Sequence, residues 1–174
     1  FDFENTDDLS NSQPPHIYLI GVWEKETGKY TAFLAKGAQD EEKIFRDFLA
    51  FAEEGGDCAL YHWTECEVHA LHQMAQKYPQ LREKIKEAIR RCVDIKAEIQ
   101  KAFYIPSPSF SLKAAAPAFG FAWRQSECGA MDSMVYYWNW LENGEEEAIK
   151  KVLTYNEDDC VAMYHVDKAV SGGP

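Results

Sequence analysis

A short connection between two strand-like segments constrains the fold of this chain more than any other feature. Residues 16–24 (HIYLIGVWE) and residues 30–34 (YTAFL) are rich in β-branched and aromatic side chains, which predicts two strands. The residues between them include Gly28, which favours a tight turn. A connection this short joins antiparallel strands, because parallel strands need a longer crossover. The sequence therefore predicts a β-hairpin.

The remaining segments predict an α/β fold with a mixed sheet. Residues 1–4 resemble the exposed end of a strand, and the polar stretch after them predicts a loop of about ten residues. Residues 40–54 have apolar side chains at helical spacing, and residues 58–63 (CALYHW) predict a short buried strand. Further helices are predicted at 64–77, 79–91, 111–119, 132–142 and 145–170, and a last short strand at 93–95. This order indicates one α/β domain over residues 1–170, followed by a disordered tail or linker at 171–174.

The charge balance argues against a protein that binds nucleic acid through a broad basic surface. The chain has 18 basic and 29 acidic residues, a net charge of −11. A nuclease that depends on metal ions is less affected, because two divalent ions would return four charges and leave about seven negative ones. If the chain acts on nucleic acid through metal ions, we therefore expect weak unaided binding of the substrate and a partner domain that supplies further affinity.

The cysteines and the N-terminus indicate the cellular setting. Five cysteines, an odd number that never forms CxxC, favour reduced thiols in a cytoplasmic protein over disulfides or a zinc ribbon. No apolar run approaches the roughly 18 residues of a membrane span, and we expect no membrane association. The chain begins without Met inside a predicted strand, so we expect it to be a fragment of a longer protein.

Two groups of residues could carry metal chemistry. Asp2 and Glu4 lie two apart on a strand, so their carboxylates project from one face and suit a hard divalent cation. The alternative is two solvated acids. Tyr155 and Asp159 are spaced i, i+4 and share one helix face. That helix would dock through Cys160, Met163 and Val166, and we expect Glu157 and Asp158 to face water.

Glu67 and the histidines have structural alternatives. Residues 64–67 (TECE) form a capping-box sequence, in which Glu67 needs no metal. His62 ends a predicted strand beside the proposed site, or it is a satisfied core histidine. His69 and His72 are spaced i, i+3 and lack the metalloprotease arrangement, so we expect them at the surface.

Three motifs follow one another along the chain: Asp2 and Glu4 on the first strand, Glu67 at the start of the helix after the fourth strand, and Tyr155 with Asp159 on the last helix. Together they resemble the DEDD exonuclease superfamily. They look most similar to the ribonuclease H-like domain attached to RecB-family nucleases. The stretches that carry the resemblance are FDFEN, IYLIGVW, LYHWTECEVHAL, VDIKAEIQKAFYIPSPSFSLKAAAPAFGF and LTYNEDDCVAMY. The resemblance implies a five-stranded mixed sheet with an antiparallel second strand, flanked by helices.

The resemblance also implies a two-metal site. Asp2, Glu4, Glu67 and Asp159 would bind two Mg²⁺ or Mn²⁺ ions, and Tyr155 would orient the attacking water. His62 and Asp94 would lie just behind these ligands. The chain departs from the superfamily's second motif, where Cys66-Glu67 replaces an aromatic residue and Asp, and His62 or Trp63 replaces Asn.

These features give three functional hypotheses. The first is a metal-dependent nuclease, a 3′–5′ exonuclease acting on DNA at single-stranded or 3′ ends, within a longer chain that carries another nuclease or helicase domain. The second is a degenerate nuclease fold that binds nucleic acid or a partner protein without cutting. The third is a metal phosphoesterase for a small molecule, because a fold alone does not fix a function.

Overall fold

Three strands form the central sheet of the protein. The computed structural model describes residues 1–6, 14–102 and 109–172. Strands β1 (Asp2–Asn5), β2 (Ile17–Glu24) and β3 (Lys29–Leu34) pair in this order, and both pairings are antiparallel. The predicted hairpin and the antiparallel second strand are confirmed. The loop predicted after residue 4 begins later, because β1 includes Asn5, and its residues 7–13 lie outside the described residues.

A second, smaller sheet contains β4 (Leu60–His62) and β5 (Cys92–Asp94), which pair in parallel. The implied single five-stranded sheet is therefore wrong in this structure, since the described strands form one sheet of three and one of two. The sheets adjoin where the amino group of Phe1 donates a hydrogen bond to the carbonyl oxygen of Tyr61 (2.7 Å). One such bond at the end of short strands does not make a ladder.

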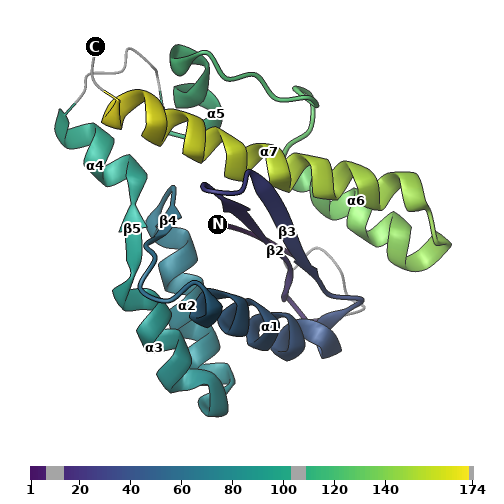
Figure 1. Ribbon diagram of the computed structural model, residues 1–174. Coiled ribbons are helices and arrows are strands. Elements are labelled where there is room, and N and C mark those ends of the chain that lie inside the picture. Colours follow the sequence, from purple (N-terminus) through teal and green to yellow (C-terminus); the bar gives the residue numbers. More distant parts are fainter. Residues whose placement is uncertain (7–13, 103–108, 173–174) are drawn as a thin grey trace.

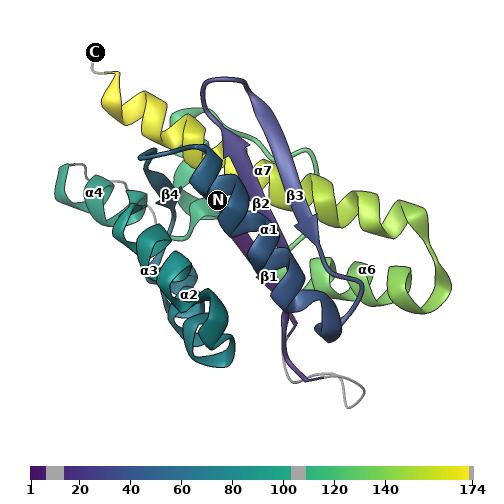
Figure 2. The same cartoon turned by 60° about the horizontal axis from the view of Figure 1, so that its bottom comes forward.

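Helices cover both faces of the three-stranded sheet (Figures 1 and 2). Helix α1 (Glu41–Glu54) lies on one face, and α6 (Ala130–Asn143) and α7 (Glu146–Ser171) lie on the other. The remaining helices are α2 (Glu65–Lys77), α3 (Arg82–Arg90), α4 (Ile95–Ala102) and α5 (Leu112–Ala115), with 3₁₀ turns at Ala38–Asp40, Pro79–Leu81 and Ala116–Phe119.

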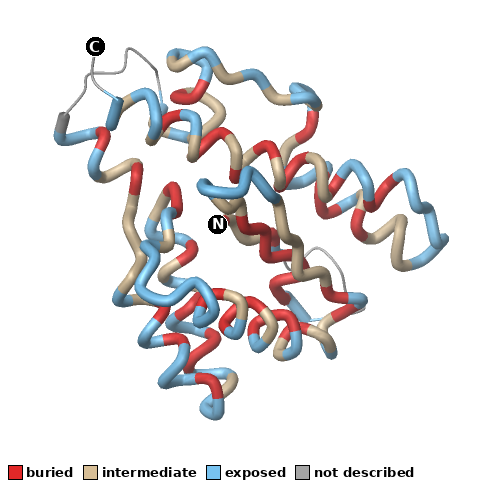
Figure 3. Tube along the Cα trace, in the orientation of Figure 1, coloured by how far each residue is buried: buried red, intermediate tan, exposed pale blue. Residues whose placement is uncertain are grey.

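The position of β2 between these helical layers explains its nearly continuous apolar sequence. Its first six residues are buried, and Figure 3 shows the buried path through the middle of the molecule. Ile20 belongs to a core cluster with Phe45 and Phe48 of α1, whereas Leu19 belongs to one with Tyr137 of α6. A strand covered on both faces needs apolar side chains at successive positions.

Several predicted boundaries need correction. The predicted helix at 79–91 is a 3₁₀ turn followed by α3, and α4 was not predicted at all. The short strand predicted at 93–95 ends one residue earlier, because Asp94 accepts a hydrogen bond from the amide of Ala97 (2.8 Å) and so begins α4. Ser171 ends α7 and Gly172 caps it, so the expected tail is partly helical, while residues 173–174 lie outside the described residues. None of the helices in the described ranges has the length and apolar character needed to cross a membrane.

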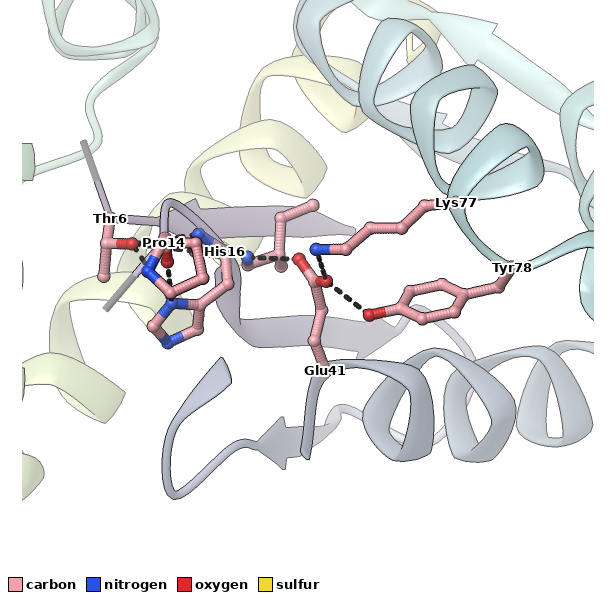
Figure 4. Close-up of polar contacts among 7 residues, drawn as sticks. Thr6, Pro14, His16, Glu41, Lys77 and Tyr78 are labelled. Atoms are coloured by element: carbon pink, nitrogen blue, oxygen red, sulfur yellow. Dashed lines mark hydrogen bonds and ion pairs between the residues drawn. The ribbon is translucent and has the colours of Figure 1, made fainter. Parts of the chain in front are cut away.

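A buried carboxylate joins β2, α1 and α2 on the side away from α7 (Figure 4). Glu41 is 1% exposed. Its carboxylate accepts hydrogen bonds from the amide of Ile17 (2.8 Å) and the hydroxyl of Tyr78 (2.7 Å), and it pairs with the ammonium of Lys77. Three donors, one of them charged, satisfy a charge that would otherwise be costly to bury.

We expect Glu41→Ala to lower the free energy of unfolding by about 2–3 kcal/mol, because the buried amide of Ile17 and the half-buried hydroxyl of Tyr78 lose their acceptor. Lys77 is 43% exposed, so water can replace its share of the interaction. Urea denaturation measures the loss. As a control, Glu83→Ala removes an acid that is 81% exposed and should leave the free energy of unfolding nearly unchanged. Equal losses in the two variants would contradict a joining role for Glu41.

Candidate metal centre

Three carboxylates from the two ends of the chain meet between β1 and α7. Asp2, Glu4 and Asp159 each offer one oxygen, and these three oxygens lie within 4.8 Å of one another. Strand alternation turns Asp2 and Glu4 towards α7. Phe3 turns the other way, and its ring packs against Phe45 of α1 at 5.5 Å between centroids. The structure therefore brings together three of the four residues expected to bind metal.

Burial makes this cluster unfavourable in its charged form. Burial, and then the charge of Asp159, raises the pKa of Glu4 to about 8. Burial also raises the pKa of Asp159 to about 6, although hydrogen bonds from Trp123 and Tyr155 and the charge of Lys113 act in the opposite direction. Asp2 has a pKa well above its ordinary value because of burial and then the charges of Glu4, Asp159 and Glu67. A bound cation would relieve both the repulsion and the desolvation.

Asn156 of α7, which the sequence did not predict as a site residue, connects the carboxylates on β1 to Tyr30 on β3. Its Nδ2 donates to Asp2 Oδ2 (2.8 Å) and, at a longer distance, to Glu4 Oε1 (3.4 Å). Its Oδ1 accepts from the hydroxyl of Tyr30 (2.7 Å), and the side chain is 0% exposed. Gly21 pairs with Asp2, and a Cβ there would lie 1.7 Å from Asn156 Oδ1. An isolated glycine in a buried strand was the available signal, because it often marks a close approach by another group.

Asp159 is held from the opposite side by the segment before α6. The indole Nε1 of Trp123 donates to Asp159 Oδ1 (2.6 Å). Lys113 Nζ lies 4.9 Å from the centroid of the Tyr155 ring and donates to the carbonyl oxygen of Cys128. Burial, and then the charges of Asp159, Glu4 and Asp2, raises the pKa of Tyr155. The phenol therefore remains protonated at neutral pH and can donate a hydrogen bond.

Glu67 lies near the cluster but outside the group of three. It is buried, and its carboxylate accepts a hydrogen bond from the Thr64 hydroxyl (3.2 Å) and lies 3.7 Å from His62 Nδ1. Thr64 caps α2 by accepting from the amide of Cys66 (3.2 Å). Glu67 thus contacts the hydroxyl of Thr64, whereas in a full capping box its carboxylate would accept a hydrogen bond from the backbone amide of Thr64. Its charge still raises the pKa of Asp2.

His62 and Asp94, the two residues expected just behind the metal ligands, make local contacts within the smaller sheet and the segments that follow its strands. His62 is buried, and its Nδ1 contacts the carbonyl oxygen of Thr64. Asp94 pairs with His62 in the small sheet and begins α4 through its bond to Ala97.

The other surface predictions have mixed outcomes. His69 and His72 are exposed, as predicted. The prediction for Asp158 is wrong, because this residue is 4% exposed and accepts hydrogen bonds from the amide (2.8 Å) and Nε (2.6 Å) of Arg124. Glu157 also pairs with Arg124, at 2.6 Å. Arg124 is far from these acids in the sequence, so helical spacing alone could not predict the pairing.

The donor set fits a hard divalent cation. Mg²⁺ and Mn²⁺ prefer oxygen ligands, and Asp2, Glu4 and Asp159 offer carboxylate oxygens close enough to share an ion. Trp123 and Asn156 donate hydrogen bonds to these carboxylates without bringing a positive charge that would compete with a metal.

A family model described as RNase_H superfamily matches residues 1–171, almost the whole chain. No curated protein and no solved structure matches the chain.

We expect the metal-free protein to lose stability as the pH rises from about 5 to about 8.5. The folded-state pKa of Glu4 (about 8) and of Asp159 (about 6) lie above their ordinary values of 4.5 and 3.8. A raised folded-state pKa contributes stability that is fully present below the unfolded-state pKa and is lost as pH rises through the folded-state value. Thermal melts in chelator measure this slope.

The matched variants are Glu4→Gln, which should flatten the slope, and Glu83→Gln, which should leave it unchanged because Glu83 is exposed. Mn²⁺ should stabilise the protein more at pH 8 than at pH 5, because it no longer has to displace protons. A metal-free protein whose stability is constant across this range would contradict the electrostatic description of the cluster.

Proposed function

The chain belongs to the RNase H superfamily, and we propose that it is a divalent-metal-dependent nuclease that hydrolyses the phosphodiester bonds of nucleic acid. We propose further that it is a 3′–5′ exonuclease with DNA as the favoured substrate. The observation that carries the proposal is the convergence of Asp2 and Glu4 with Asp159, whose oxygens lie within 4.8 Å. Buried and half-buried acids gathered without a paired cation are costly to a fold, and a metal requirement accounts for them.

In this proposal Asp2, Glu4 and Asp159, with Glu67 as a fourth ligand, hold two Mg²⁺ or Mn²⁺ ions. When bound, such ions supply an acidified water and neutralise charge on the leaving oxygen. The chain's own residues orient the reactants. Tyr155 keeps its proton and positions the attacking water by a hydrogen bond, because a phenol is a poor base at neutral pH. Trp123 keeps Asp159 turned towards β1.

The substrate must approach a domain that is acidic overall. We propose that Lys113, now hydrogen-bonded to the carbonyl oxygen of Cys128, receives a substrate phosphate, because its ammonium lies beside the Tyr155 ring and acts electrostatically on Asp159. Arg124 is less available, since it pairs with Asp158 and Glu157. Because the chain has a net charge of −11 and would attract a polyanion poorly, we propose that another nuclease or helicase domain in a longer chain delivers the single-stranded 3′ end.

One observation favours a different function. Glu67 is engaged by Thr64 and lies outside the group of three close carboxylates. If it never reaches a metal, the site is one ligand short. The chain would then be a degenerate module that binds nucleic acid or a partner protein without cutting it.

We expect Asp2→Asn and Asp159→Asn to lower Mn²⁺-dependent cleavage by more than about 100-fold without loss of fold, because each removes charge at the reacting centre. The assay uses 5′-labelled single-stranded DNA, on which a 3′–5′ exonuclease leaves a ladder of shortened products, and circular DNA as a substrate without ends. Asp47→Asn, which changes an acid whose side chain is 44% exposed and lies outside the proposed site, should retain wild-type activity. Full activity in either site variant would exclude the proposed centre.

Glu67→Gln separates the nuclease from the degenerate module. The Gln oxygen can still accept the Thr64 hydroxyl, so the melting temperature should stay nearly unchanged. As a metal ligand, however, the neutral amide loses the charge that attracts a dication, so most activity should be lost. Glu67→Asp should keep part of it. Wild-type turnover by Glu67→Gln at both low and saturating Mn²⁺ would show that Glu67 has a structural role and is not a metal ligand.

A further inference from the structure

The buried amide of Asn156 has one orientation that suits carboxylates in their metal-binding form. Ionised carboxylates accept hydrogen bonds and cannot donate them, so the amide nitrogen faces Asp2 and Glu4. The amide oxygen must then face Tyr30, whose hydroxyl donates to it at 2.7 Å. The partners therefore fix both ends of the side chain, and Tyr30 holds the amide against rotation.

The surrounding backbone is shaped to admit this amide. Gly21 leaves the space that Asn156 Oδ1 occupies, and any side chain at that position would collide with it. Gly21 also pairs with Asp2 in the sheet. The Tyr30–Asn156 pair thus reaches from β3 across β2 to β1, which fixes α7 relative to the two acids on the first strand.

The chemistry of an amide suits this position better than that of a cation. A lysine or arginine would neutralise the acids and compete with a metal, whereas a neutral amide supplies hydrogen bonds and no charge. Each carboxylate meets the amide through one oxygen, and Glu4 is also hydrogen-bonded by the side chains of Ser133 and Tyr18. Hydrogen bonds of this kind commonly orient carboxylate ligands, and their loss weakens metal binding.

We propose that Asn156, locked by Tyr30, is the positioning residue that orients Asp2 and Glu4 to bind a divalent cation. The proposal rests on the proposed metal-dependent function. It assigns Asn156 and Tyr30 no contact with substrate or with reacting atoms. Both act through the two carboxylates.

A double-mutant cycle tests the proposal, with the affinity for Mn²⁺ measured from the electron paramagnetic resonance signal of the free ion. Tyr30→Phe keeps the ring and removes the donor, and Asn156→Ala removes the amide. We expect each to weaken Mn²⁺ binding by about 10- to 100-fold. The double variant should bind no more weakly than Asn156→Ala alone, because Tyr30 acts through Asn156.

Tyr78→Phe is the matched control. It also removes a hydroxyl that donates to a buried carboxylate, Glu41, but on the opposite side of the sheet. It should lower the melting temperature without changing Mn²⁺ affinity. Weakened binding in Tyr30→Phe, at a melting temperature no lower than that of the control, would separate positioning from general destabilisation even if Asn156→Ala failed to fold.

Two results would overturn the proposal, and they differ in what else they remove. Wild-type Mn²⁺ affinity in folded Tyr30→Phe would refute the positioning role and leave the proposed nuclease intact. A wild-type protein that binds no Mn²⁺ would remove the metal-dependent function, and this inference with it.

Discussion

Mutual repulsion among three clustered carboxylates, one buried and two half-buried, is the constraint on which the rest of this structure depends. Asp2, Glu4 and Asp159 present oxygens within 4.8 Å of one another, and their raised pKa values reflect the cost. Packing elsewhere must hold them there, since they would separate if free to do so. The docking of α7 on the sheet supplies that force. Core clusters around Val152 and around Cys160, Met163 and Val166 bury its apolar face.

Glu41 and the three-carboxylate cluster show opposite solutions to the problem of placing acids inside the protein. Glu41 receives an ammonium and two neutral donors, so its charge is satisfied within the protein. Asp2 and Glu4 receive a neutral amide, and Glu4 also the hydroxyls of Tyr18 and Ser133. Asp159 receives an indole, a phenol and the influence of a distant lysine, so most of these donors are neutral and much of the charge remains uncompensated. The first arrangement suits a structural role. The second leaves a demand that a divalent cation can meet, as expected of an RNase H superfamily member.

The acidic surface and the incomplete ligand set bear on how such a domain would work. A net charge of −11 opposes the approach of a polyanion, so the proposed nuclease would depend on a local cation such as Lys113 and on the proposed partner domain more than a basic nuclease would. The Thr64 hydroxyl engages Glu67 beside the cluster, close enough to influence Asp2. Whether Glu67 completes the site or only supports α2 decides between catalysis and binding.

Local periodicity allowed much of this protein to be predicted from sequence. The short connection determined the hairpin, strand alternation placed Asp2 and Glu4 on one face, and helical spacing did the same for Tyr155 and Asp159. Packing between distant segments decided the rest. This packing separated the strands into two sheets and buried Asp158 against Arg124. It also placed the amide of Asn156 against Gly21, where it accepts a hydrogen bond from Tyr30. A repeat of two or 3.6 residues determines which side chains share a face, but which faces meet depends on contacts between segments far apart in the chain.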